Sequence, residues 1–321
     1  MKFENELPYW MAFNHFLPRW GIEKINKLLV SILHAEKIAL SDFYEMEDTQ
    51  IAEKFLLSQK EISAIRTAGQ ELPNLAFVVE DILSQGYEII TLNSPDYSKI
   101  LKSNMKVSLS PPLLYIKGDK QMLQEASIAV VGSRDASDIS FEFTDNVCLK
   151  ATKNFKVVVS GFAKGVDQRA LESTLKVKGR SIIVLPQGIM TFGTGIKKYY
   201  SQIVEGDVLV LSTFFPKAPW SVGLAMARNP VIYGLAEDIF VAQSADKGGT
   251  WEGVNDGLRR GRKIFVRVSQ PGEGTANNLF FEKGAIPVDL NGEATKSPDW
   301  VVPPVERRTQ LETPSLFDQE E

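Results

Sequence analysis

Residues 20–70 carry apolar side chains at the spacing of amphipathic helices. The apolar positions are Ile22, Ile25, Leu28, Leu29, Ile32 and Leu33. Ser41 and Ser58 stand where helix N-caps are expected, and Glu61 completes a capping box with Ser58. We predict a small helical domain over residues 1–74, similar to SAM or helix-hairpin-helix modules. Its apolar stripe indicates core packing, and a helix-hairpin-helix contact with DNA is the alternative.

From residue 75 onward the pattern changes to short β-branched runs separated by segments of helix length. Nearly continuous Val and Ile runs indicate strands buried on both faces, as in a parallel sheet covered by helices. The predicted strands are Tyr87–Leu92, Leu113–Ile116, Ser127–Val131, Lys156–Ser160, Ser181–Leu185, Asp207–Leu211, Asp238–Ala242 and Lys263–Arg267. Residues 75–290 are therefore predicted to form an α/β domain with an extended Rossmann-like, doubly wound, mostly parallel sheet. Prolines and acidic residues over 291–321 predict a mobile acidic tail.

The composition is that of an ordinary globular protein, with 44% hydrophobic and 24% charged residues. The single cysteine, Cys148, excludes an internal disulfide framework and a cysteine-based zinc site. The two histidines, His15 and His34, lie in the helical region, so imidazole catalysis and histidine metal sites are excluded from the α/β domain. No apolar run is long enough to span a membrane, and early acidic residues interrupt any secretory signal. We therefore expect a cytoplasmic protein.

Charge is distributed unevenly along the chain. The formal net charge is −4, yet residues 147–200 contain ten basic and two acidic side chains. This segment thus carries +8 and the remainder of the chain −12, and a second basic cluster follows over Arg259–Lys263. Solvated helix faces would give the same count. A nucleic-acid partner is favoured only if phosphate-binding turns meet at the same place.

Three glycine-containing turns follow predicted strands, where ligands bind in open α/β folds. They are Gly132-Ser133-Arg134, Ser160–Asp167 and Lys247–Thr250. Glycine lets the backbone approach an anion, a helix N-terminus offers unpaired N–H groups, and Arg134 and Lys164 add positive charge. We predict a phosphate site where the three turns meet. For any single turn, ordinary backbone geometry and capping remain the alternative.

The G-x-G-x-x-G dinucleotide fingerprint and the Walker A pattern are both missing. We therefore expect no NAD or ATP cofactor and no metal. The turns alone do not distinguish a polynucleotide from a small nucleotide as the ligand that carries the phosphate.

Four groups of residues resemble the DprA/Smf family of DNA-processing proteins. They are Ile128–Arg134, Val158–Asp167, Arg228–Leu235, and a later series of Lys247–Thr250, Gly261–Phe265, Asn278–Leu279 and Gly284–Ala285. The second group is similar to the family's S-G-[LF]-A-[RK]-G-[IV]-D motif and is the most specific match. The lead-in over 89–118 is also similar, so the resemblance covers about residues 75–290. The winged-helix module that many members append is not found in the short tail.

The resemblance implies a non-enzymatic protein that binds and protects single-stranded DNA and loads a RecA-type recombinase onto it. The context would be DNA uptake and transformation, recombination, defence or a mobile element, and we expect a homodimer. The expected phosphate-binding residues are Gly132, Ser133, Arg134, Ser160, Gly161, Lys164, Gly165, Lys217, Arg228, Asn229, Gly248, Gly249 and Thr250. Phe162, Phe214 or Phe215 could stack on bases, although a buried core position is the commoner role of such a ring.

Three positions depart from the family pattern. Leu171 replaces a usual His, Thr213 a usual Glu, and Pro230 the second Arg of an R-N-R motif. Because the change at Pro230 removes one cation, we expect a different affinity or strand path.

An enzyme or nucleotide sensor is the alternative function. Gly248–Glu252 resembles a contracted form of the nucleotide phosphoribohydrolase signature, with Glu252 and Asp167 as acid/base candidates. Both carboxylates also suit the first turn of a helix. Thr313–Phe317 is faintly similar to a sliding-clamp-binding peptide.

Overall fold

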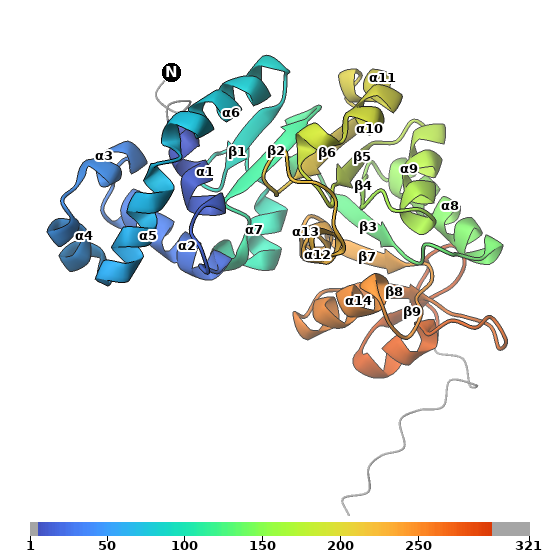
Figure 1. The fold of residues 1–321 in the computed structure, drawn as a ribbon. Helices are drawn as coiled ribbons and strands as arrows, with labels where there is room; N and C mark the ends of the chain where they lie inside the picture. The colour runs from blue at the N-terminus through green and yellow to red at the C-terminus, as the bar shows by residue number, and fades with distance from the viewer. Residues whose placement is uncertain (1–5, 297–321) are drawn as a thin grey trace, which may run out of the picture.

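The computed structural model describes residues 6–296, in which nine strands form one sheet (Figure 1). The strand order is β1-β2-β6-β5-β4-β3-β7-β8-β9. The strands are β1 (Glu88–Thr91), β2 (Leu113–Lys117), β3 (Ser127–Val131), β4 (Val157–Ser160), β5 (Ser181–Val184), β6 (Val208–Ser212), β7 (Asp238–Val241), β8 (Ile264–Arg267) and β9 (Ile286–Val288). The strands from β6 to β9 pair in parallel, and β2 pairs antiparallel with both β1 and β6. The predicted doubly wound, mostly parallel sheet is confirmed.

All eight predicted strands form, each within one residue of its expected ends. The ninth strand, β9, is short and contains Pro287, so its pattern is too weak to identify it from the sequence. The chain adds β4, β5 and β6 on one side of β3, and then β7, β8 and β9 on the other. The topological switch point therefore lies between β3 and β7, and this is where ligands bind in such folds.

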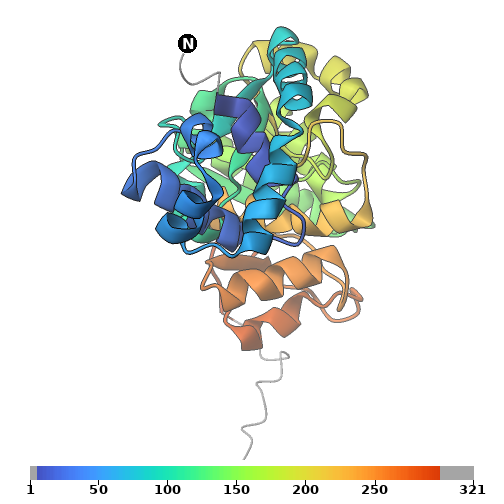
Figure 2. The same cartoon turned by 60° about the vertical axis from the view of Figure 1, so that its left-hand side comes forward.

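Helices precede, connect and cover the strands. Their bounds are α1 (Leu7–His15), α2 (Ile22–Val30), α3 (Leu40–Glu45), α4 (Asp48–Phe55), α5 (Gln59–Gly69), α6 (Leu72–Ser84), α7 (Lys99–Met105), α8 (Asp138–Lys153), α9 (Val166–Lys176), α10 (Gly193–Lys198), α11 (Tyr200–Val204), α12 (Val222–Ala227), α13 (Asn229–Gly234) and α14 (Gly249–Arg259). Helices α1–α5 lie at the end of the molecule beyond β1, far from α8 and α9 (Figure 1). In the turned view, α14 lies at the end opposite α6 (Figure 2).

Two apolar layers enclose the sheet, because alternate residues of a strand point to opposite faces. Ile128 and Val130 of β3 belong to a cluster with residues of α8 and α9, such as Cys148. Ala129 and Val131 belong to the other cluster, which includes residues of α13 and α14 and continues into the N-terminal helices. Cys148 is fully buried. The boundary predicted at residue 74 falls inside α6.

One of the two predicted helix caps is confirmed and the other is wrong. The capping box is confirmed, since the Ser58 backbone N–H donates to the Glu61 carboxylate at 2.7 Å. The cap at Ser41 is wrong, because α3 begins at Leu40. The carboxylate of Glu6 accepts from the Leu40 and Ser41 backbone N–H groups at 2.7 and 3.3 Å. A cap from a distant segment leaves no local pattern in the sequence.

The first residues after the α/β domain are bonded to it. Ala294 bridges Val288 of β9, and Glu293 pairs with Lys150 of α8 at 2.5 Å. The rest of the predicted tail, including the clamp-peptide resemblance at Thr313–Phe317, lies outside the described residues. Within residues 6–296, no helix has the length and apolarity needed to cross a membrane.

His15 joins the helical region to the sheet and generates a testable pH dependence. Its Nε2 lies 2.8 Å from the hydroxyl of Tyr115, and its ring packs edge-on against Phe215. Desolvation lowers the pKa of His15 to about 4. The unfolded chain therefore binds the proton more readily, and the folded state loses stability as the pH falls from about 6.5 toward 4.

We predict that this group contributes up to about 3 kcal/mol to the difference in unfolding free energy between neutral pH and pH 4. Urea denaturation across that range measures it, with His15→Gln as the comparison. The variant should show a shallower pH dependence over the same interval. Identical pH slopes for the two proteins would contradict the assignment.

Candidate nucleic-acid interface

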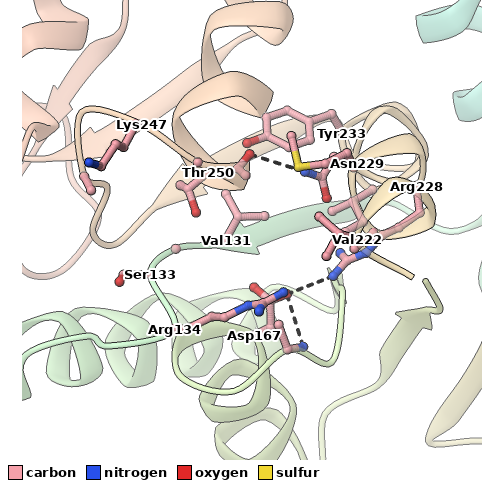
Figure 3. Close-up of a pocket in the computed structure, with 18 residues that line it drawn as sticks. Val131, Ser133, Arg134, Asp167, Val222, Arg228, Asn229, Tyr233, Lys247 and Thr250 are labelled. Atoms are coloured by element: carbon pink, nitrogen blue, oxygen red, sulfur yellow. Dashed lines mark hydrogen bonds and ion pairs between the residues drawn. The ribbon is translucent and has the colours of Figure 1, made fainter. Parts of the chain in front are cut away.

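A cavity of about 430 Å³ lies at the switch point (Figure 3). Its walls come from the turn after β3, from α12 and α13, and from the turn that leads from β7 into α14. Eight of the predicted phosphate-binding residues line it: Gly132, Ser133, Arg134, Arg228, Asn229, Gly248, Gly249 and Thr250. Ser160, Gly161, Lys164, Gly165 and Lys217 are placed elsewhere. All three predicted turns thus supply lining residues, the turn after β4 through Ala163 and Asp167.

The turn after β4 packs directly beneath the turn after β3. The Val166 backbone N–H donates to the Ser133 carbonyl at 3.2 Å. Gly165 has φ +87°, and a Cβ there would lie 2.3 Å from the same carbonyl oxygen. A Cβ at Gly132 would lie 2.6 Å from the Val166 side chain. Both glycines are therefore required for the close approach of the two turns.

Ser160 and Gly161 serve the same packing. The Ser160 hydroxyl donates to the carbonyl of Val130 at 2.8 Å, which ties β4 to β3. A Cβ at Gly161 would lie 1.5 Å from a guanidinium nitrogen of Arg228. Gly161 thus provides the space that the Arg228 side chain occupies.

Arg228 and Asp167 form a buried ion pair at the floor of the cavity (Figure 3). Their nitrogen and oxygen atoms are 3.5 Å apart, and the side chains are 6% and 9% exposed. The Asp167 carboxylate also accepts from the Ala163 backbone N–H at 3.4 Å. Burial raises the pKa of Asp167, and the positive charge of Arg228 opposes that shift. The pair joins the first turn of α9 to the junction between α12 and α13.

The remaining predicted lysines lie outside the cavity. Lys164 lines a neighbouring hollow of about 420 Å³, together with Gly165 and Arg169. Arg134 lines both spaces and connects them. Lys217 forms an ion pair with Asp81 of α6 at 2.9 Å.

Five of the ten basic side chains counted over 147–200 form ion pairs with carboxylates in the folded chain. The ion pairs are Lys150–Glu293, Lys156–Glu237, Lys164–Asp135, Arg169–Asp145 and Arg180–Asp119. Around the cavity the balance is different. Its lining residues include three cations, Arg134, Arg228 and Lys247, and one carboxylate, Asp167. The lining therefore carries a net charge of +2. The local field therefore favours an anion.

The aromatic residues chosen from the sequence occupy packed positions in two cases. Phe162 packs edge-on against Phe192 at 5.1 Å between ring centroids, and Phe215 packs against His15 and Phe16. Phe214 is half-buried.

An exposed apolar wall beside the cavity was missed from the sequence. Trp220, Val222 and Met226 are 50%, 67% and 38% exposed, and Val222 and Met226 line the cavity. Their exposure depends on how α12 folds back over the switch point, which no local pattern specifies. Tyr233, another lining residue, was also missed, because its spacing is that of a core residue.

The two carboxylates of the alternative function do not share one space. Asp167 lines the cavity, whereas Glu252 lines a separate hollow between α13 and α14 together with Pro230 and Asp256. Pro230, which departs from the family pattern, is therefore directed away from the cavity. Leu171 is 1% exposed in the core, and Thr213 is half-buried.

The fold and this site define a Rossmann-type protein with a cavity of positive net charge at its switch point. A family model described as DNA recombination-mediator protein A matches residues 88–295. The chain therefore belongs to this family, whose members carry the names DprA and Smf.

Two relatives illustrate the sequence similarity. DNA processing protein DprA of Streptococcus pneumoniae is 31% identical over 157 residues, which are 49% of this chain and 55% of the relative. DNA processing protein DprA of Bacillus subtilis is 27% identical over 198 residues, which are 61% of this chain and 66% of the relative. The matches thus span less than two thirds of either relative.

Two solved structures share the fold. The structure of DprA from Streptococcus pneumoniae has a TM-score of 0.59 and 24% identity, and the match covers 84% of this chain and 95% of that one. DNA processing protein A from Helicobacter pylori is described for its single-stranded DNA binding mode. It has a TM-score of 0.53 and 26% identity, with 63% and 90% of the two chains covered.

Two glycines provide a matched test of the turn packing. Gly165 and Gly248 both have positive φ, but nothing lies within 4 Å of a Cβ built at Gly248. Gly248→Ala should cost about 1–3 kcal/mol of unfolding free energy from backbone strain alone. Gly165→Ala should cost about 1–3 kcal/mol more, because its Cβ collides with the carbonyl of Ser133. Chemical denaturation measures both, and equal losses would contradict this packing.

Proposed function

We propose that the chain binds single-stranded DNA at the cavity of the switch point. The observation that carries this proposal is the convergence of the turns after β3 and β7 on a cavity whose lining has a net charge of +2. Phosphates would contact Arg134, Lys247 and the N-terminus of α14. Backbone N–H groups and cations are the usual partners of nucleic-acid phosphates.

The exposed apolar wall supports a single strand over a duplex. Val222 and Met226 line the cavity together with the cationic turns, and the exposed ring of Trp220 comes two residues before Val222 in the chain, so unpaired bases could reach this segment. Proteins that bind single strands combine a cationic path for the backbone with rings on which bases stack. The bases of a duplex are paired and stacked inside the helix, so their faces are not available to this wall.

The relatives support the same assignment and extend it. The family is described as a recombination mediator, and the Helicobacter pylori relative by its single-stranded DNA binding. We therefore include in the proposal a homodimer in the cytoplasm that protects the strand and loads a RecA-type recombinase onto it. The loading step can be tested by measuring ATP hydrolysis by the recombinase on a strand precoated with single-strand-binding protein. If this chain loads the recombinase, its addition should increase the rate of ATP hydrolysis.

A non-enzymatic role is part of the proposal. Asp167 is engaged by Arg228, and Glu252 lies in a different hollow, so the two carboxylates are not placed to act together on one substrate. A mechanism that uses two carboxylates as acid and base needs each of them within hydrogen-bond reach of the proton that it transfers.

We predict that Arg134→Ala combined with Lys247→Ala weakens binding to a labelled oligothymidine at every salt concentration. Each lost phosphate contact should reduce the slope of log affinity against log salt by about 0.7. Fluorescence anisotropy at several salt concentrations, with a matched duplex as competitor, measures both quantities.

The control changes two cations of the other basic cluster, Arg259→Ala with Lys263→Ala. These residues pair with Asp256 and Asp238 and do not line the cavity. The control should leave affinity and slope close to those of the unaltered protein. An equal loss in the two double variants, or salt-insensitive binding, would reject the cavity as the DNA site.

A further inference from the structure

Helices α8, α9 and α14 follow the three glycine-containing turns, and protein groups already bond to the N-termini of α8 and α9. At α8, the side-chain carbonyl of Gln243 accepts from the Ser137 backbone N–H at 2.9 Å. At α9, the Ser133 carbonyl accepts from the Val166 N–H at 3.2 Å, and the Asp167 carboxylate accepts from the N–H of Ala163. Each of these two N-termini thus has a backbone N–H group that is already bonded to a protein acceptor.

The third helix, α14, begins without a cap. Its N-cap residue is Gly248, with φ +90°, and no side chain of the described residues accepts from the N–H groups of its first turn. The Asn229 side chain donates to the carbonyl of Gly249 at 3.3 Å and leaves those N–H groups open. The first N–H groups of a helix have no partner within the helix. Gly249 and Thr250, which carry two of them, line the cavity. The helix is 11 residues long, so its dipole adds to the attraction for an anion.

Two buried polar atoms in the same cavity lack partners. The hydroxyl of Tyr233 and the Nε of Arg228 make no hydrogen bond in the described part of the chain. Both residues are buried, with 5% of their surface exposed, so bulk water does not replace the missing partners. Both residues line the cavity. The Tyr233 hydroxyl lies against α14, because a Cβ at Gly253 would be 2.9 Å from it. Buried polar groups in native proteins are normally bonded, so these atoms indicate a polar ligand.

The walls of the cavity differ in character from one side to the other. The turns after β3 and β7 present backbone N–H groups, a hydroxyl from Thr250, and the cations Arg134 and Lys247. Helix α12 adds the apolar side chains of Val222 and Met226, and the Met226 sulfur would lie 3.6 Å from a Cβ at Gly249. A ligand that matches both walls carries an anionic group at one end and a flat apolar group at the other. A nucleotide has this form.

We propose that the cavity binds a nucleotide that carries a terminal phosphomonoester, with the phosphate at the uncapped N-terminus of α14 and the base against α12. This inference rests on the proposed function and specifies the ligand of the same site. The same chemistry occurs at the phosphorylated end of a DNA strand and in a free mononucleotide, and the two sources are separated below.

The charge favours a terminal monoester over an internal diester. An internal phosphodiester carries one negative charge, whereas a terminal phosphomonoester carries a negative charge of about 1.5 to 2 at neutral pH. The lining carries a net charge of +2. A terminal phosphate also presents one more free oxygen to the N–H groups of Gly249 and Thr250.

The test compares oligothymidines that differ only at their ends: both ends hydroxyl, 5′-phosphate, or 3′-phosphate. Each carries an internal fluorophore, and anisotropy gives the affinity for the full chain. We expect one phosphorylated strand to bind about tenfold more tightly than the hydroxyl strand, the increase that added hydrogen bonds to a charged group provide. Competition by thymidine monophosphate, thymidine and inorganic phosphate then measures binding of the free nucleotide.

Thr250→Asp removes the proposed phosphate site while keeping the helix. A carboxylate in the first turn interacts favourably with the helix dipole, so the fold should be retained. The variant should bind the phosphorylated and hydroxyl strands equally. Gln59→Asp is the matched control, since it adds the same charge at an exposed position in the first turn of α5 and should keep the full preference.

Tyr233→Phe separates binding from folding. Removing an unpartnered buried hydroxyl should leave the unfolding free energy unchanged or higher. The preference for the phosphorylated strand should nevertheless fall severalfold, because the hydroxyl contacts the nucleotide. A merely structural tyrosine would show the opposite pattern, with stability lost and preference kept.

The outcomes distinguish this inference from the proposed function. Equal affinity for all three strands, with thymidine monophosphate failing to compete, overturns the inference and leaves strand binding intact. Failure of every strand to bind overturns the proposed function. If thymidine monophosphate competes and the three strands bind equally, the ligand is the free nucleotide. If a phosphorylated strand binds more tightly and thymidine monophosphate does not compete, the ligand is the strand terminus.

Discussion

The buried ion pair between Asp167 and Arg228 is the interaction on which the site depends. It joins the first turn of α9 to the junction between α12 and α13, two segments that are far apart in the sequence and meet at the switch point. Removing one partner of such a pair typically costs about 3–5 kcal/mol, because the other charge stays buried without compensation. Gly161 leaves the space that the guanidinium occupies, so the glycine and the arginine form one unit.

This pair also decides which groups remain available to a ligand. Asp167 satisfies a backbone N–H near the start of α9, and the Ser133 carbonyl satisfies another. The N-terminus of α14 has no such partner and faces the cavity beside Lys247. The architecture thus closes one helix terminus with protein atoms and leaves another for an anion. An acidic protein with a net charge of −4 can in this way present a local net charge of +2.

The sheet could be predicted from the sequence because its strands are buried on both faces and leave continuous apolar runs. Gly132 and Gly165 could also be assigned to turns between a strand and a helix, since a short stretch of sequence is enough to identify such a turn. The burial of Arg228, the cap from Glu6 and the exposure of Trp220 depend on contacts between distant segments. An arginine that binds a phosphate and one that neutralises a buried carboxylate have the same sequence signature.

The central claim is that the strand lies at the switch point, and photo-crosslinking tests it most directly. An oligonucleotide containing 4-thiothymidine is irradiated with the full chain, and the modified peptides are identified by mass spectrometry. The account predicts adducts in the peptides that contain Arg134, Trp220 and Lys247. Adducts confined to the Arg259–Lys263 cluster or to helices α1–α5 would contradict it.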